Sequence, residues 1–431
     1  MRSPTPEQPL RAHPPVAPGP AVPAAPRRVL PVIVLAQLAG TSPWFAVNAV
    51  MPELRGEFGW PAAAVGTLTS AVQLGFIGGA LVFALLAIAD RYSARKLFLG
   101  CALAAAGGTL LALHTAESFA ALWFWRAFTG FCLAGIYPVG MKLAALWFPR
   151  GLGPALGLLI AALVLGSASP HALRALSAGA PWSVVFEGVA LASALAGLLV
   201  FLAVPEPPHA PAGVTGLHWR ALGAAAIEPR VRASVLGYFG HMWELYTMWV
   251  LVPAILATRL AAGAALSWAA FAVLGAGALG CALGGVLARR FGSARVAGAQ
   301  LATSGLCCVV APLMLQAPDA LFAAWLLAWG ITVSGDSPQF SALTAGNAPP
   351  ALVGSVLTLA NSIGFAISIL SIQLFVALAE HRPLSQLLPW LGLGPLLGVL
   401  ALRPLLAGPG TARAARSPGS RDDRPGRQPD E

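Results

Sequence analysis

Long apolar runs alternate with short polar segments along most of the chain. A helix needs roughly 20 mostly apolar residues to cross a bilayer, and the runs have about that length. The pattern therefore predicts an all-α integral membrane protein with twelve transmembrane helices, six on each side of a polar linker at 205–231. The predicted spans are 29–51, 62–88, 97–114, 118–146, 151–176, 182–204, 232–258, 266–288, 296–316, 321–345, 351–379 and 384–404.

The two ends of the chain differ from this pattern. Residues 1–28 contain nine prolines and no apolar core of signal-peptide length, so we expect a disordered cytoplasmic tail. Residues 405–431 are expected to form a second disordered cytoplasmic tail.

Composition supports a membrane protein and excludes other classes. The 431 residues are 57% hydrophobic and 10% charged, with a mean hydropathy of +0.76, which is too apolar for a soluble domain. The formal charge of +10 comes from basic residues that stand singly or in small groups, not from a stripe of the kind that binds nucleic acid. The five cysteines lie in apolar runs, and no disulfide framework, metal-binding spacing or phosphate loop is present, so we expect no metal and no other cofactor.

The distribution of Lys and Arg predicts the orientation. If both termini are cytoplasmic, 21 of the 26 basic residues fall on the cytoplasmic side and four on the outer side. Cytoplasmic loops carry an excess of Lys and Arg, so this orientation is favoured, and we expect a multi-pass protein of the cytoplasmic (inner) membrane. The outer basic residues are Arg55, Arg174, Arg259 and Arg382.

A short charged segment at 89–96 separates two predicted spans, and a related segment stands at 288–296. Aligning Arg91 with Arg290 also places Lys96 opposite a basic residue of the second copy. Two copies of one hairpin, about two hundred residues apart, indicate two copies of one half.

The first segment resembles the loop between the second and third helices of the major facilitator superfamily. Asp90, Arg91, Arg95 and Lys96 match its Asp-Arg pair and its later basic pair, whereas its two glycines are replaced; in the second copy, Arg289 stands where the acid belongs. The chain is also similar in general character to the branch of cyanate-type and nitrate porters. It lacks, however, the arginines that nitrate porters carry in spans two and eight.

This resemblance implies two six-helix bundles, 29–204 and 232–404, around a central path for a solute. Spans one, four, seven and ten should line the path, and spans three, six, nine and twelve should face lipid. The charged segment should act as a conformational latch, in which Asp90, flanked by Arg91 and Arg95, docks at the cytoplasmic start of span eleven near Asn347. Glycine pairs spaced Gly-x-x-x-Gly in spans two, five and eight predict close helix approach, either between the halves or within one bundle.

Five ionisable residues lie deep in the predicted spans. A charge at mid-bilayer costs about 2.5–3.5 kcal/mol on insertion scales, so such residues usually serve substrate binding, ion coupling or proton relay. We therefore expect them to face one shared aqueous cavity. They are Arg126 and Lys142 in span four, His241 and Glu244 in span seven, and Asp336 in span ten.

The residues of spans seven and ten suggest proton coupling. His241 and Glu244 are three residues apart and should share a helix face; Glu244 is the candidate for proton exchange, and the alternative is a His–Glu pair that satisfies itself in the core. Asp336 and Gln339 flank Pro338, which removes a backbone donor and should break the helix. They are candidates for contact with a substrate or a coupling ion, or else belong to a satisfied kink.

In span four, the segment Arg-Ala-Phe-Thr-Gly from Arg126 to Gly130 is similar to a motif of proton-coupled facilitators. The resemblance implies a proton relay or a site that holds an anion, and a structural partner is the alternative. Lys142 either contacts substrate or extends to the cytoplasmic interface. In span one, Trp44, Phe45 and Asn48 are candidates for the cavity wall.

Together these observations predict a monomeric secondary active transporter, not an enzyme, that moves a small solute by alternating access with protons as the coupling ion. The basic residues of span four favour a small organic or inorganic anion. Glu244 and Asp336 equally suit proton-driven efflux of a drug or metabolite. The alternative of a different class is a facilitator-fold sensor or assembly factor without turnover.

Overall fold

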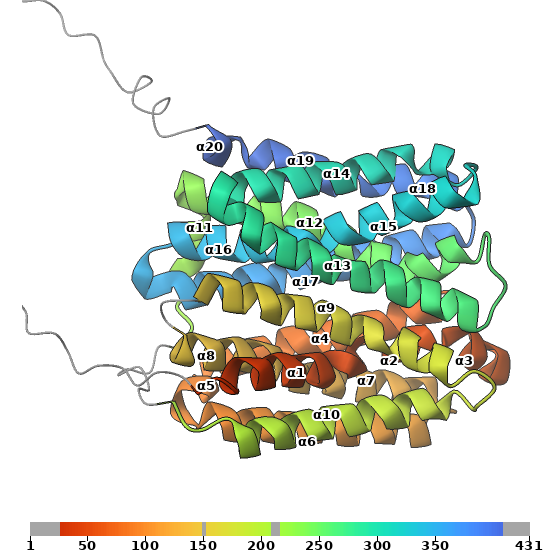
Figure 1. Cartoon of the computed structure of the whole chain (residues 1–431), viewed down its shortest axis with the longest axis horizontal. Helices are drawn as coiled ribbons and strands as arrows, with labels where there is room; N and C mark the ends of the chain where they lie inside the picture. The colour runs from red at the N-terminus through yellow and green to blue at the C-terminus, as the bar shows by residue number, and fades with distance from the viewer. Residues whose placement is uncertain (1–25, 149–151, 208–215, 408–431) are drawn as a thin grey trace, which may run out of the picture.

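The computed structural model describes residues 26–148, 152–207 and 216–407 (Figure 1). Nearly all of the two predicted tails therefore lies outside the described residues. Within the described ranges every regular element is a helix, which confirms the predicted all-α fold.

The first half supplies six spans. Span one consists of a helix, a short 3-10 turn and a second short helix, and span four is broken into two helices. The elements are α1 (Val29–Thr41), η1 (Ser42–Phe45), α2 (Ala46–Ala49), α3 (Met51–Phe58), α4 (Ala64–Leu85), α5 (Ile88–Arg91), α6 (Ala94–His114), α7 (Phe119–Leu133), α8 (Tyr137–Trp147), α9 (Leu152–Leu176) and α10 (Ser183–Ala203).

The second half repeats this arrangement after a linker helix, with breaks in spans ten and twelve. Its elements are α11 (Arg220–Ile227), α12 (Pro229–Leu256), α13 (Ala264–Phe291), α14 (Ser293–Met314), α15 (Asp319–Gly335), α16 (Ser337–Asn347), η2 (Pro350–Leu352), α17 (Val353–Ala379), α18 (Leu384–Leu391), α19 (Leu393–Ala401) and α20 (Arg403–Leu406).

Eleven spans in the described ranges are long and apolar enough to cross a membrane. The twelfth predicted span is α12, whose 28 residues are also long enough at about 1.5 Å per residue. Its polar residues, including His241 and Glu244, lower its hydropathy. The helix nevertheless lies among α16, α17 and α19, so its polar side chains are shielded from lipid.

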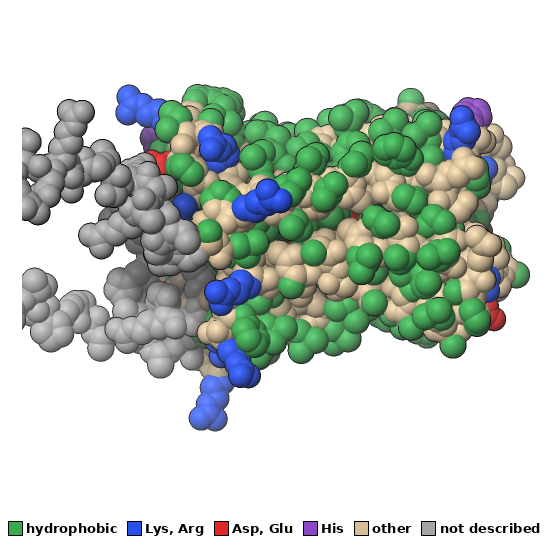
Figure 2. Space-filling model, turned by 90° about the horizontal axis from the view of Figure 1, so that it is seen from above, with side chains coloured by type: hydrophobic (Ala, Val, Ile, Leu, Met, Phe, Trp, Pro, Cys, Tyr) green, Lys and Arg blue, Asp and Glu red, His purple; other side chains and the backbone are tan. Residues whose placement is uncertain are grey.

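The two halves lie side by side with their helices nearly parallel (Figure 1). They meet mainly where α9 packs against α13 and where α4 packs against α17. In Figure 2, hydrophobic side chains are spread over the visible long face, while most of the visible Lys and Arg side chains lie toward the left end. This distribution agrees with a bundle whose long sides lie in lipid and whose basic residues gather at one membrane surface.

Spans four and ten each have a glycine in close contact with the backbone of a neighbouring helix, a feature that the sequence analysis did not identify. A Cβ atom on Gly130 would lie 1.9 Å from the carbonyl oxygen of Val72, and one on Gly330 would lie 2.1 Å from that of Val273. Gly130 and Gly330 are 200 positions apart, as are Trp125 and Trp325, Gly135 and Gly335, and Pro138 and Pro338. The internal repeat thus extends into the packing of span four on span two and of span ten on span eight.

The predicted Gly-x-x-x-Gly contacts fall into two groups. Gly75 in span two approaches the carbonyl of Ala127, and Gly280 in span eight approaches that of Ile331, so both pack inside their own half. Gly157 in span five instead lies near Cys281 of the other half, with 4.0 Å between its Cβ position and the carbonyl oxygen. Packing within a bundle therefore accounts for Gly75 and Gly280.

Candidate functional site

A small cavity lies between the two halves, and helices of both contribute to its wall. Its volume is about 40 Å³, which is room for a few water molecules at most. The aromatic and polar residues that line it are Trp44, Tyr137, Tyr238, Tyr246, Trp249, Phe365, Ser334, Ser337, Ser341 and Asn361. No Asp, Glu, Lys, Arg or His belongs to the described residues of this lining.

Aromatic rings close the centre of this cavity. Trp44 of η1 stacks on Tyr246 of α12, with 6.1 Å between ring centroids and 9° between planes. Phe365 of α17 lies 5.7 Å from Trp44 and 5.3 Å from Tyr246. Trp44 is therefore the point where span one of the first half meets spans seven and eleven of the second, and its predicted place on the cavity wall is confirmed.

His241 and Asp336 form a buried pair next to the cavity. The Nδ1 atom of His241 lies 2.8 Å from Oδ1 of Asp336, and the side chains are 1% and 0% exposed. Asp336 lies where span ten breaks between α15 and α16, and the neighbouring Ser334 and Ser337 line the cavity. At the break, the serines thus line the cavity, whereas the aspartate is buried and does not belong to the lining.

Glu244 faces a different environment. Its Oε1 accepts a hydrogen bond from the Trp329 indole at 2.7 Å and from the Cys308 thiol at 3.2 Å, and its Oε2 accepts one from the Ser304 hydroxyl at 2.8 Å. These donors come from α14 and α15, inside the second bundle. His241 and Glu244 do not pair with each other, which was the alternative given in the sequence analysis. Each side chain instead contacts a different neighbouring helix.

Arg126 is held by backbone carbonyls of span one. Its Nη1 donates to the carbonyl of Pro43 at 2.8 Å and its Nη2 to that of Trp44 at 2.5 Å. The side chain is fully buried, and no carboxylate lies within ion-pairing distance among the described residues. The guanidinium fork therefore fixes the η1 turn that presents Trp44 to the cavity.

Two predicted polar residues lie away from the cavity lining. The Nδ2 atom of Asn48 donates to the Thr69 hydroxyl at 2.9 Å, which joins span one to span two. Gln339 is buried in α16 one turn after Asp336. Phe45, like Asn48, is absent from the described lining of the cavity.

The charged segment after span two does not reach span eleven in this conformation. The Oδ1 atom of Asp90 lies 2.5 Å from Nζ of Lys142, which also donates to the carbonyl of Ala89. Asn347, the expected docking point, instead accepts a hydrogen bond from Arg230 at 2.9 Å. Lys142 thus joins α8 to α5 within the first half.

The two arginines of this segment have different surroundings. Arg95 donates to the carbonyl of Phe201 at 2.8 Å and lies 3.9 Å from Glu206, which ties α6 to the end of α10. Arg91 is exposed, with no ion pair among the described residues.

Four of the five deep ionisable residues are buried, and Lys142 is partly exposed. None of the five lines the cavity in this conformation, so the prediction that they share one aqueous cavity is not met. Arg126 and Glu244 contact hydrogen-bond partners on neighbouring helices, and His241 lies against Asp336. The physical reason is that a buried polar group is stabilised by hydrogen bonds, and these partners lie in the helix packing, not in the hollow.

Sequence reasoning missed most of the cavity wall. Tyr238, Tyr246 and Trp249 all belong to α12 and could have been selected because Tyr and Trp combine an apolar body with a polar tip. His171 of α9, which follows Pro170, was also missed; it is 2% exposed and its Nε2 has no hydrogen-bond partner among the described residues.

In a comparison of the sequence with models of protein families, the Major Facilitator Superfamily matches residues 33–372, which is most of the chain. The chain belongs to the major facilitator superfamily. The match begins in span one and ends in span eleven, so it includes spans of both halves and all the residues that line the cavity between them. A search of curated proteins finds no match.

Two solved structures of transporters have a similar shape. The human organic anion transporter MFSD10 (TETRAN) has a TM-score of 0.68 at 15% identity, with 88% of this chain and 99% of that chain covered. The nucleoside transporter NupG, as a D323A mutant, has a TM-score of 0.65 at 12% identity, with the same coverages. At these identities the likeness establishes the fold.

Proposed function

We propose that this protein is a secondary active transporter that carries a small solute through the central cavity by alternating access. The observation that carries the proposal is the small cavity between two repeated halves, lined by residues of both. A cavity of about 40 Å³ is too small for an organic solute, since ligand pockets usually measure about 300–1,000 Å³. The halves must therefore separate at α9–α13 or α4–α17 to admit it.

The cavity wall favours a small amphipathic solute with a largely apolar or aromatic body. Rings such as Trp44, Tyr246 and Phe365 offer stacking surfaces, whereas Ser337 and Asn361 offer hydrogen bonds. No charged side chain on the described wall would compensate a charged solute. This favours transport of an uncharged drug-like or metabolite-like molecule, in either direction across the membrane.

A small organic anion is the second candidate, and Arg126 is the observation that favours it. Its Nε has no hydrogen-bond partner among the described residues, and it holds Trp44, whose ring lies on the cavity. An anion would have to displace the carbonyl of Pro43 or Trp44 from the guanidinium when the cavity opens. Membership of the cyanate-type branch stays a prediction.

We propose His241 and Asp336 as the coupling pair. The pair lies beside the cavity at the break of span ten, and its charge changes when a proton is gained or lost. Because Ser334 and Ser337, the close sequence neighbours of Asp336, line the cavity, opening of the halves would change the access of the pair to water. Glu244, with three donors inside the second bundle, fits a positioning role better than exchange with the cavity.

The test is flux in reconstituted vesicles under an imposed pH gradient, with a panel of neutral amphipathic solutes, organic anions and organic cations. Asp336→Asn should abolish gradient-driven flux while exchange without a gradient persists. Asp319→Asn, a matched change at the exposed start of α15, should leave both unchanged. Gradient-driven flux that survives Asp336→Asn would refute the coupling pair, and tight binding without flux of any solute would favour a sensor.

A further inference from the structure

A second and larger hollow lies on the outside of the second bundle, away from the central cavity. It has a volume of about 490 Å³ and lies between α12, α17 and the two helices of span twelve. This volume falls within the range of about 300–1,000 Å³ that is typical of small-molecule sites. None of the deep ionisable residues discussed above lines it.

The hollow lies where span twelve contacts α17 only slightly. The helix is interrupted at Gly392, between α18 and α19, and Pro395 lacks the amide that would continue the hydrogen-bond ladder across the break. A Cβ on Gly392 would lie 3.2 Å from Cys308 of α14, so the absence of a side chain at the break allows span twelve to pack closely against α14. Contact between α18 and α17 is correspondingly slight.

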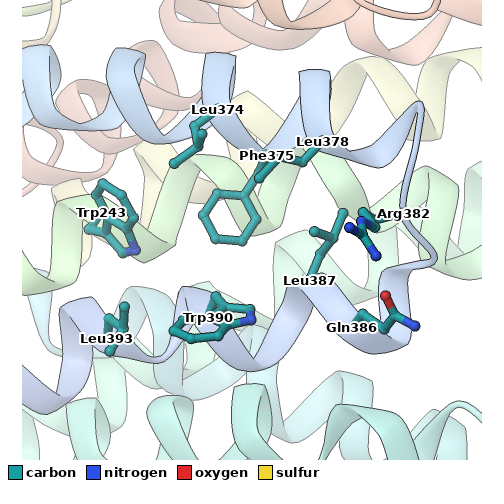
Figure 3. Close-up of a pocket in the computed structure, with 9 residues that line it drawn as sticks. All are labelled: Trp243, Leu374, Phe375, Leu378, Arg382, Gln386, Leu387, Trp390 and Leu393. Carbon is teal, nitrogen blue, oxygen red and sulfur yellow. The ribbon is translucent and has the colours of Figure 1, made fainter.

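The wall of the hollow is apolar over most of its length and polar at one end. Figure 3 shows Trp243 and Leu393 at one end, the rings of Phe375 and Trp390 between, and Arg382 with Gln386 at the other end. Trp390 is 63% exposed, an exposure that faces hydrocarbon in a membrane. A ligand that fits this wall has an apolar chain and an anionic or hydrogen-bonding head.

Arg382 differs from the other basic residues at the same end of the bundle. Arg174 pairs with Glu53 at 2.7 Å, Arg259 pairs with Asp319 at 2.6 Å, and Arg55 donates to the carbonyl of Trp60 at 3.3 Å. Among the described residues, the side chain of Arg382 has neither an ion pair nor a hydrogen bond. An unpaired guanidinium at the mouth of an apolar groove provides charge complementarity for a phosphate.

We propose that this groove binds one anionic phospholipid, with its phosphate at Arg382 and Gln386 and an acyl chain along Phe375, Leu378 and Trp390. By the orientation assigned from basic residues, the lipid belongs to the outer leaflet. The bound chain fills the space between span eleven, which contacts α4 of the other half, and span twelve. The lipid therefore supports the helix on which one of the two contacts between the halves depends.

The experiment measures lipid binding to the purified full-length protein by native mass spectrometry. The probes are phosphatidylglycerol, phosphatidylcholine with the same acyl chains, and glycerol phosphate without chains. We expect one phosphatidylglycerol per protein, bound at least about fivefold more tightly than phosphatidylcholine, the effect of about one Arg near an anionic headgroup. Glycerol phosphate should neither bind measurably nor compete.

Variants separate the groove from the general lipid surface. Arg382→Gln should reduce phosphatidylglycerol binding to the level of phosphatidylcholine, whereas Arg55→Gln, at the same end but outside the groove, should not. Leu374→Trp, which adds bulk at a 43% exposed position of the wall, should remove the bound lipid of either kind. Equal binding of both lipids, an unchanged preference in Arg382→Gln, or full competition by glycerol phosphate would each overturn the proposal.

Discussion

The tight packing of span four on span two allows one prediction to be worked through from the structure. In Gly130→Ala, the added Cβ would start 1.9 Å from the carbonyl oxygen of Val72. Such contacts are essentially never shorter than 3.0 Å, so α7 and α4 would have to separate by about 1.1 Å, the difference between 3.0 and 1.9 Å. The obstacle is backbone, which cannot rotate aside as a side chain would.

The expected cost follows from two opposing effects. Overpacking of this kind costs about 1–3 kcal/mol, whereas replacing Gly by Ala within a helix contributes about 0.5–1 kcal/mol of stability. Taking the middle of each range, about 2 and about 0.75 kcal/mol, the net loss should be about 1.3 kcal/mol, or roughly tenfold in the unfolding equilibrium. Arg126 stands one turn before Gly130, so the separation should also weaken its bonds to span one.

The assay is reversible unfolding in mixed micelles, followed by circular dichroism during titration with a denaturing detergent. Gly78→Ala is the matched control, since it lies on α4 with nothing within 4 Å of its Cβ position, and it should be neutral or slightly stabilising. Gly330→Ala should resemble Gly130→Ala, because its Cβ would lie 2.1 Å from the Val273 carbonyl. If Gly130→Ala were as stable as Gly78→Ala, the helix-contact reasoning would be refuted.

Three further predictions concern polar groups outside the cavity lining. Glu244→Gln should lower the free energy of unfolding by about 1–3 kcal/mol. The NH2 group of the glutamine would face the Trp329 indole N–H or the Ser304 hydroxyl, which are themselves donors, so buried polar groups would lose their partners. Unchanged stability in the same detergent titration would contradict this. Arg126→Lys should lower flux at least about tenfold with the helical content preserved, since one ammonium cannot replace a two-pronged contact, and wild-type flux in vesicles would be the contrary result. A double-mutant cycle with Asp90→Asn and Lys142→Gln should give a coupling of at most about 1 kcal/mol, because both side chains are partly exposed; a much larger coupling would require a buried pair.

The pairing of polar residues was the part of the site that sequence could not supply. His241 and Glu244 are three residues apart, so their side chains project about 60° apart around α12. That difference is enough for His241 to meet Asp336 of span ten and for Glu244 to meet Trp329 and Ser304. Which partner each one finds depends on where α14, α15 and α16 lie, and hydropathy carries no information on this.

One signal was available in the sequence and was not used. Trp125, Gly130 and Pro138 recur at positions 325, 330 and 338. Comparing the two halves residue by residue would have indicated that Gly130 and Gly330 serve the same helix contact. The comparison would also have placed Asp336 at a break equivalent to the one before Pro138.

The sequence by itself determined the number and order of the helices, because each segment that crosses lipid must be apolar over a fixed length and must satisfy its own backbone hydrogen bonds. The bias of basic residues predicted an orientation, and the cost of burying charge identified the polar positions of interest. Only the tertiary structure decided that Arg126 holds the Trp44 turn, that Asp336 pairs with His241, and that rings, not charges, line the cavity. Those contacts join segments far apart in the chain, and their energies depend on helix positions that are set by the packing of the whole bundle.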